Sequence, residues 1–168
     1  HVIRRSRTDA EALASALINA KDKIKYCDTC FNFTEINNSI CEICRDRNRD
    51  HSCICVVEQA SDVLVLEANA IHKGVFHVLG GLLSPLDGVG PEDLRVKELS
   101  VRVSAVEVKE VILAFNAGPE GDATSNYLYQ LLSEHVGISR PARGLPVGAD
   151  LDLADGITLT HAFAGRSL

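Results

Sequence analysis

The sequence predicts an α/β protein that is built on a parallel sheet and preceded by a helix and a small four-cysteine module. From residue 53 onward, stretches typical of buried strands alternate with stretches typical of helices, which favours parallel strands covered by helices on both faces. Before them, two CxxC pairs stand in a polar stretch over residues 26–50, where the apolar period of the preceding residues stops.

Composition and charge limit the possible classes of function. The 168 residues are 46% hydrophobic and 24% charged, as in ordinary globular domains. The net charge of −6, from 17 basic and 23 acidic residues, excludes a uniformly basic nucleic-acid binder, so any contact with phosphate has to be local. Because no apolar run reaches the roughly 18 residues of a membrane span and no signal peptide is evident, we expect a soluble, cytoplasmic protein.

The first expected element is a helix over residues 8–25. Thr8 and Asp9 can cap its start, apolar residues recur at helical spacing, and the lysines near its end suit the helix dipole. The chain begins at His1 and contains no methionine, from which we expect that a preceding segment is missing.

Four strands and four helices are expected after the cysteine module. The strands are 53–58, 75–79, 110–115 and 138–143, and the helices are 61–69, 92–106, 120–135 and 155–164. In open parallel sheets, function collects in the loops at the carboxyl ends of the strands. Three of these loops begin near Glu58, Gly80 and Asn116, and the long loop 80–91 is rich in glycine and proline.

The cysteines predict a metal site. Two CxxC pairs are separated by ten residues: Cys27, Cys30, Cys41 and Cys44. Four thiolates in two tight turns favour one structural Zn²⁺ ion. The alternative, reduced thiols or a redox CxxC, lacks the βαβ context of a redox motif and leaves the second pair without a purpose. Cys53 and Cys55 alternate with apolar residues along a strand, so we expect buried side chains there rather than ligands.

Six basic side chains flank the cysteine pairs: Lys21, Lys23, Lys25, Arg45, Arg47 and Arg49. They form a local positive patch on an acidic chain. Two interpretations stay open, since such a patch can contact phosphate groups or simply be a solvated surface.

Acidic residues follow the first and third expected strands. Glu58 ends the first strand, and Glu120 and Asp122 follow the third, so the three should lie at one edge of the sheet. Glu58 has no packing reason to close an apolar strand, and we expect it to be functional. For Glu120 and Asp122 a second interpretation stays open, because the helix dipole alone favours acids in a first turn.

This arrangement resembles the Toprim domain of topoisomerases, primases and nucleases, in which a glutamate after the first strand acts as general acid/base and a later DxD motif holds magnesium. The order and spacing of four further blocks is similar to the RecR family of bacterial recombination mediators over nearly the whole chain. The blocks are the CxxC pairs, HVLGGLLSPLDGVGPEDL at 77–94, EVILAFNAGPEGDAT at 110–124 and ARGLPVGADLDLAD at 142–155.

The resemblance implies four segments. Residues 1–25 would be a helix left from an N-terminal helix-hairpin-helix domain, 26–50 a zinc finger, 51–147 the Toprim domain and 148–168 an assembly segment. It also implies a nucleoid-associated DNA-repair mediator, not an enzyme, that works with RecO and RecF to load RecA on gapped single-stranded DNA coated with single-strand-binding protein. We expect a homo-oligomer, a tetrameric ring in the family and a dimer or weakened tetramer here, with weakened DNA binding because the hairpin is absent.

One departure separates the chain from catalytic Toprim enzymes. Asn116 and Gly118 stand where those enzymes carry two aspartates, so a magnesium site should be absent or weak. We therefore expect Glu58, Glu120 and Asp122 to form a face that binds a basic partner. The competing interpretations are a magnesium-dependent enzyme that cleaves or joins nucleic acid, and a zinc-stabilised structural module with an inert acidic pocket.

Overall fold

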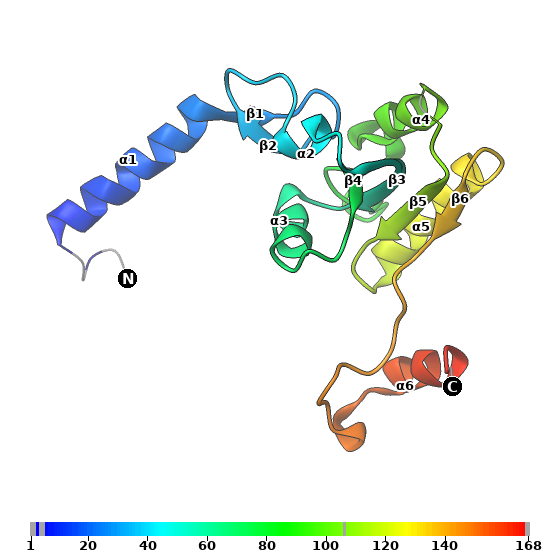
Figure 1. Ribbon diagram of the computed structural model, residues 1–168. Coiled ribbons are helices and arrows are strands. Elements are labelled where there is room, and N and C mark those ends of the chain that lie inside the picture. Colours follow the sequence, from blue (N-terminus) through cyan, green and yellow to red (C-terminus); the bar gives the residue numbers. More distant parts are fainter. Residues whose placement is uncertain (1–2, 4–5, 106, 167–168) are drawn as a thin grey trace.

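A four-stranded parallel sheet lies at the centre of the chain (Figure 1). The structure is a computed structural model and describes residues 3, 6–105 and 107–166. The strands are β3 (Asp50–Val57), β4 (Gly74–Val78), β5 (Glu110–Ala114) and β6 (Gly137–Ser139), in the order β4-β3-β5-β6. Val57 pairs with Val78 on one side and with Ala114 on the other, so three strands end at the same edge.

Helices cover both faces of the sheet, as predicted. On one face, α4 (Val96–Ala105) and α5 (Pro119–Leu132) bury a core around Leu99 and Leu128. On the other face, α3 (Ala60–Ala68) buries a second core around Val63 and Phe76. Because both faces are buried, β4 is buried at every residue and carries no polar-apolar alternation.

Several expected elements are shorter than predicted; the helix expected at 120–135, for example, ends at Leu132. The helix expected at 92–106 divides into a 3-10 turn (Pro91–Asp93) and α4, because Leu94 is extended and the amide of Arg95 donates to the carbonyl of Leu79. Residue 106, its expected end, lies outside the described residues. The last strand stops at Ser139 rather than 143, since Pro141 has no amide to donate to a ladder.

The cysteine module is built on a short antiparallel ribbon. Strand β1 (Ile24–Tyr26) pairs with β2 (Phe33–Glu35), and the four-residue helix α2 (Glu42–Arg45) follows. The predicted helix 8–25 therefore ends two residues early, because the chain turns into β1 at Ile24.

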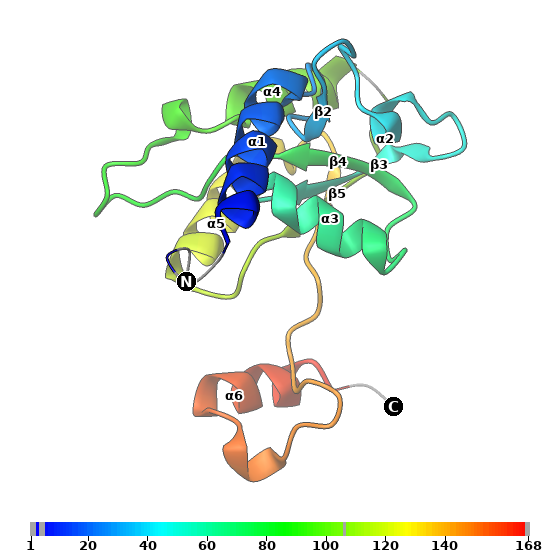
Figure 2. The same cartoon turned by 90° about the vertical axis from the view of Figure 1, so that its left-hand side faces the viewer.

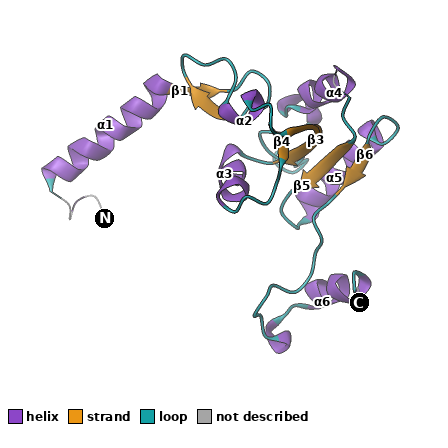
Figure 3. Cartoon of the chain, in the orientation of Figure 1, coloured by secondary structure: helices purple, strands orange, loops and turns teal. Residues whose placement is uncertain are grey.

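Helix α1 (Arg7–Lys23) extends away from the sheet in Figure 1, and helix α6 (Gly156–Ala164) lies apart from the sheet in both Figure 1 and Figure 2. Helix α1 is capped by Ser6, whose hydroxyl accepts from the amide of Asp9, rather than by Thr8 or Asp9 as predicted. Helix α6 begins one residue after the predicted start, with Asp155 as its cap, and ends at Ala164 as predicted. It follows a 3-10 turn at Leu151–Leu153 and a long connection (Figure 3). Neither helix buries a residue, and no helix in the described part of the chain is long and apolar enough to cross a membrane.

Candidate functional site

Four sulfur atoms converge in the module. The Sγ atoms of the predicted ligands lie within 4.8 Å of one another, although they come from two separate turns: Cys27, Cys30, Cys41 and Cys44. Three of the four side chains are buried, and Cys44 is half-buried. A closed set of four thiol ligands is typical of a structural metal site rather than a catalytic one, which keeps a position open.

Backbone geometry holds the sulfurs in place. The amide of Cys41 donates to Sγ of Cys27 at 3.3 Å, and the amide of Cys44 donates to Sγ of Cys41 at 3.5 Å. Phe31, directly after the first pair, has a φ of 62°, and its amide donates to the carbonyl of Cys27 at 3.0 Å. A left-handed phenylalanine is uncommon, so this turn is held by its surroundings rather than by local preference.

The four thiols shift one another's pKa values because they are linked by hydrogen bonds in a small volume. Hydrogen bonds from the Cys30 thiol, and then from those of Cys41 and Cys44, hold the pKa of Cys27 far below its usual value. The same contact with Cys27 raises the pKa of Cys30 well above its usual value. Four thiolates so close together need a cation, which the sulfur set can take up as a metal ion.

The module also closes one edge of the sheet. Strand β4 is an edge strand, and three groups pair with its outward-facing backbone. The carbonyl of Cys30 accepts from the amide of Val78 at 2.8 Å, Arg102 donates to the carbonyl of Phe76 at 2.6 Å, and Arg49 donates to the carbonyl of Gly74 at 3.1 Å. The cysteine cluster and the sheet are therefore joined through the backbone of Cys30.

The six basic residues do not form one uniform patch. Lys21, Lys23, Arg45 and Arg47 are exposed, while Lys25 lies 4.0 Å from Asp28. Arg49 instead forms a bidentate ion pair with Glu67 in addition to its bond to Gly74, and its side chain is only 20% exposed. Arg49 thus holds α3 and β4 together, whereas Lys21, Lys23, Arg45 and Arg47 are exposed to solvent.

The three acidic residues lie at the predicted edge but have different surroundings. Glu58 follows β3 and is half-buried, and exposed Glu120 accepts from the hydroxyl of Ser84 at 2.9 Å. Asp122 accepts from Arg140 at 2.5 Å and from Arg143 in a bidentate pair at 2.5 and 3.2 Å. Within the described part of the chain, the cysteine cluster is the only group of three or more His, Cys, Asp or Glu side chains close enough to share an ion.

Sequence reasoning missed the two arginines. It assigned residues 138–143 to a strand, whereas Arg140 and Arg143 follow the shorter β6 and reach back to α5. Arg143 first, and then Arg140, hold the pKa of Asp122 well below its usual range. The fourth strand ends at the same edge of the sheet as the others. The position of Arg140 and Arg143 just after this strand was therefore the signal in the sequence that could have placed them at the site.

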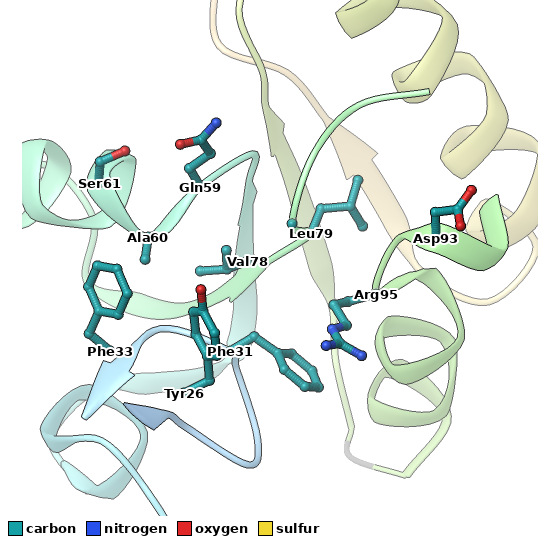
Figure 4. Close-up of a pocket in the computed structure, with 11 residues that line it drawn as sticks. Tyr26, Phe31, Phe33, Gln59, Ala60, Ser61, Val78, Leu79, Asp93 and Arg95 are labelled. Carbon is teal, nitrogen blue, oxygen red and sulfur yellow. The ribbon is translucent and has the colours of Figure 1, made fainter. Parts of the chain in front are cut away.

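A cavity of about 410 Å³ between the module and the sheet was also not predicted (Figure 4). Tyr26 and Phe33 stack on one side with ring centroids 5.8 Å apart. On the other side, Arg95 lies over the ring of Phe31 at 4.9 Å. No signal in the sequence pointed to this site, because its three aromatic residues at 26–33 follow no motif and its arginine lies about 60 residues later.

His77 packs against Phe31, one of the residues that line this cavity. Its ring is fully buried in β4, lies edge-on to Phe31 at 5.6 Å, and donates from Nε2 to the carbonyl of Arg95 at 3.0 Å. Burial lowers the pKa of His77 to about 4.

The two remaining cysteines lie in β3, outside the sulfur cluster. Cys55 is buried as predicted, while Cys53 is half-buried, with its thiol 3.8 Å from Glu110.

Comparison with known proteins agrees with this arrangement. The profile of the Toprim domain matches residues 52–142, and the profile described as RecR, C-terminal matches residues 144–167. The sheet and its acidic edge thus define a Toprim-domain protein. The Recombination protein RecR of Moorella thermoacetica is 50% identical over 167 residues, which are 99% of this chain and 83% of that protein.

Two further relatives have the same name. The Recombination protein RecR of Rippkaea orientalis is 48% identical over 166 residues, and that of Trichormus variabilis is 47% identical over 166 residues. These cover 99% of this chain and 83% and 89% of the respective relatives. The chain belongs to the RecR family, which confirms the predicted resemblance.

Proposed function

We propose that the chain is a mediator of DNA repair and homologous recombination that has no catalytic step of its own. The observation that carries this proposal is the 50% identity to a recombination protein over 99% of the chain. By this proposal it works with RecO and RecF and helps to load RecA on gapped single-stranded DNA. The direct test is complementation: the gene, with any preceding segment restored, should rescue the ultraviolet sensitivity of a bacterium that lacks its own family member.

The acidic edge supports the absence of catalysis. Asn116 and Gly118 supply no carboxylate, and the charge of Asp122 is compensated by two guanidinium groups. A magnesium ion would therefore find few of the hard oxygen ligands that it needs. A magnesium-dependent enzyme predicts the opposite, namely DNA nicking that requires Mg²⁺ and disappears in Glu58→Gln.

We propose that the cysteine cluster holds one structural Zn²⁺ ion. Four thiolates, three of them buried, suit this soft ion and leave no position for a substrate. Elemental analysis of the purified protein should find one zinc per chain. A cluster that loads iron instead would give a coloured protein and contradict this assignment.

We propose that Glu58, Glu120 and Asp122 form a face for a basic partner such as RecO or RecF. Glu58 and Glu120 form no ion pair with the described residues, whereas Asp122 contributes mainly by holding Arg140 and Arg143 in place. Glu58→Gln with Glu120→Gln should weaken RecO binding and reduce its dependence on salt. Unchanged binding in a titration by calorimetry would reject the face.

We also propose that basic residues in the module and just before it contact DNA phosphates. The candidates are Lys21, Lys23, Lys25, Arg45 and Arg47, since Arg49 is engaged inside the protein. Each neutralised phosphate makes the affinity more sensitive to salt. Lys21→Gln with Lys23→Gln should lower the slope of log affinity against log salt by about 1 to 2.

Homo-oligomer formation is supported by the apolar residues of the two outer helices. Leu13, Leu17 and Ile18 of α1 are more than half exposed, as are Ile157 and Phe163 of α6. Such residues favour burial against another copy. Light scattering should therefore show a dimer or a weakened tetramer, and Leu17→Glu or Phe163→Glu should shift it toward the monomer.

A further inference from the structure

The most open aromatic surface of the module lies at the cavity between the β1-β2 ribbon and the sheet. Tyr26 and Phe33 are direct partners in the ribbon, so their rings stand on the same face, with an angle of 25° between their planes. They are 60% and 47% exposed. Large rings left in water lose the free energy that burial would give, and such a surface commonly marks a binding site.

The cavity offers a second flat group and polar groups at its rim. The guanidinium carbon of Arg95 lies over the ring of Phe31, 4.9 Å from its centroid, in a cation-π contact. Gln59 and Ser61 at the start of α3 are exposed and line the same cavity (Figure 4). Asp93 also lines the rim, where its carboxylate accepts from the amide of Gly90. The floor is apolar, formed by buried side chains that include Val78 and Leu79. Its volume of about 410 Å³ lies in the range of small-ligand sites.

Local charge favours a nucleic acid over an apolar peptide. Residues 21–49 carry six basic and five acidic side chains, in a chain that has 17 basic and 23 acidic ones. Lys21 and Lys23 lie in the last turn of α1, directly before the strand that carries Tyr26. Aromatic platforms beside positive charge bind unpaired bases, because every base has a face that can stack and a phosphate that follows it.

We propose that this cavity binds unpaired nucleobases of single-stranded DNA, which stack on Tyr26 and Phe33 while Arg95 contacts the adjoining base or phosphate. This rests on the proposed function and adds a site to it that phosphate contacts alone do not supply. Gln59 and Ser61 hydrogen-bond the edges of the inserted base. Because stacking is possible only for unpaired bases, the site distinguishes single strands from duplex DNA.

The composition of the chain provides the readout. It has no tryptophan and only three tyrosines, Tyr26, Tyr127 and Tyr129. In the double variant Tyr127→Phe, Tyr129→Phe, Tyr26 becomes the only strong emitter. Adding oligothymidylate to this full-length variant should quench the emission of Tyr26 in a saturable way. A duplex of the same length, or an abasic strand with the same phosphates, should leave it nearly unchanged.

A double variant and a matched control test the stacking contact. Tyr26→Ala with Phe33→Ala should weaken binding of the single strand about tenfold or more by fluorescence anisotropy, with a label on the DNA. Ile36→Ala is the matched control, because Ile36 lies in the same module, is 47% exposed like Phe33, and does not line the cavity. Circular dichroism and metal content verify that each variant is folded.

The outcomes divide clearly. Quenching by single strands together with the loss in the double alanine variant supports the site. If the double variant binds like the parent while Lys21→Gln with Lys23→Gln binds more weakly, the stacking site is rejected and the proposed function stands. If no DNA binds even at low salt, both the site and the DNA contact of the proposed function are rejected. Quenching only by a protein partner would reject the site in favour of a protein-docking groove.

Discussion

The amide of Val78 donates to the carbonyl oxygen of Cys30, so the residue that supplies a candidate metal ligand also completes the edge of the sheet. Metal binding and sheet protection are thereby linked. Removing the metal with a chelator should release the module and raise the hydrogen-exchange rate of the Val78 amide about tenfold or more. The adjacent Leu79 amide, which donates to Val57 within the sheet, is the internal control. Equal protection of Val78 with and without metal would contradict the link.

Arg49 connects α3 to the same edge strand through Glu67 and Gly74. Arg49→Lys keeps the charge but loses the bidentate geometry and one of the two contacts. We expect it to lower the free energy of unfolding by about 1 to 3 kcal/mol in urea denaturation. Arg47→Lys, at an exposed position of the same module, should stay within about 0.5 kcal/mol of the parent. Equal stability of the two variants would show that the pair is not structural.

His77 makes stability depend on pH. The unfolded chain binds a proton at this side chain near pH 6.5, while burial keeps the folded side chain neutral until about pH 4. The unfolded state therefore gains protons first, and the free energy of unfolding falls as pH decreases from about 6.5 to 4. His77→Gln keeps a donor for the carbonyl of Arg95 but does not titrate.

The comparison of the two proteins isolates this contribution. Between pH 6.5 and 4 the parent should lose about 3 kcal/mol more stability than His77→Gln, measured by urea denaturation at each pH. Other groups titrate in both proteins and cancel in the difference. Parallel pH profiles would mean that the folded protein protonates His77 at its ordinary pKa.

Asp122, in the first turn of α5, forms ion pairs with Arg140 and Arg143 and so holds the segment that follows β6. Asp122→Asn removes the charge that Arg140 and Arg143 share, and these partly exposed pairs are worth about 1 kcal/mol or less. We expect limited trypsin cleavage near residues 140–143 to become up to about fivefold faster, with little change in the melting temperature. Glu120→Gln, which loses only a contact to Ser84, should cleave at the parental rate. Faster cleavage in both variants would indicate general loosening instead.

The sequence was sufficient for the parts of the fold that depend on periodicity and for the metal cluster. The strands ending at Val57, Val78 and Ala114 are apolar runs bounded by polar loops. The spacing of the two CxxC pairs alone predicted that four sulfur atoms would converge. The edge shared by Glu58, Glu120 and Asp122 followed from the parallel order. Where local rules were incomplete, as at Leu94 and Pro141, element ends were misplaced.

Long-range side-chain contacts could not be predicted in the same way. The pairing of Asp122 with Arg143 joins two segments through guanidinium geometry, and the contact of Phe31 with Arg95 joins two different layers. Neither leaves a period or a spacing in the sequence. The basic patch shows the same limit, because Lys23 and Arg49 look equivalent in sequence although only Arg49 is engaged inside the fold.

The closed edge of β4 also bears on how the protein behaves in concentrated solution. A bare edge strand pairs readily with the edge of another molecule, and β4 carries the large apolar side chains of Val75, Phe76 and Val78. Cys30, Arg49 and Arg102 occupy the hydrogen-bonding positions that a foreign strand would need. Protein from which the metal has been removed should therefore precipitate through edge-to-edge pairing of β4 strands, even while most of each molecule is still folded.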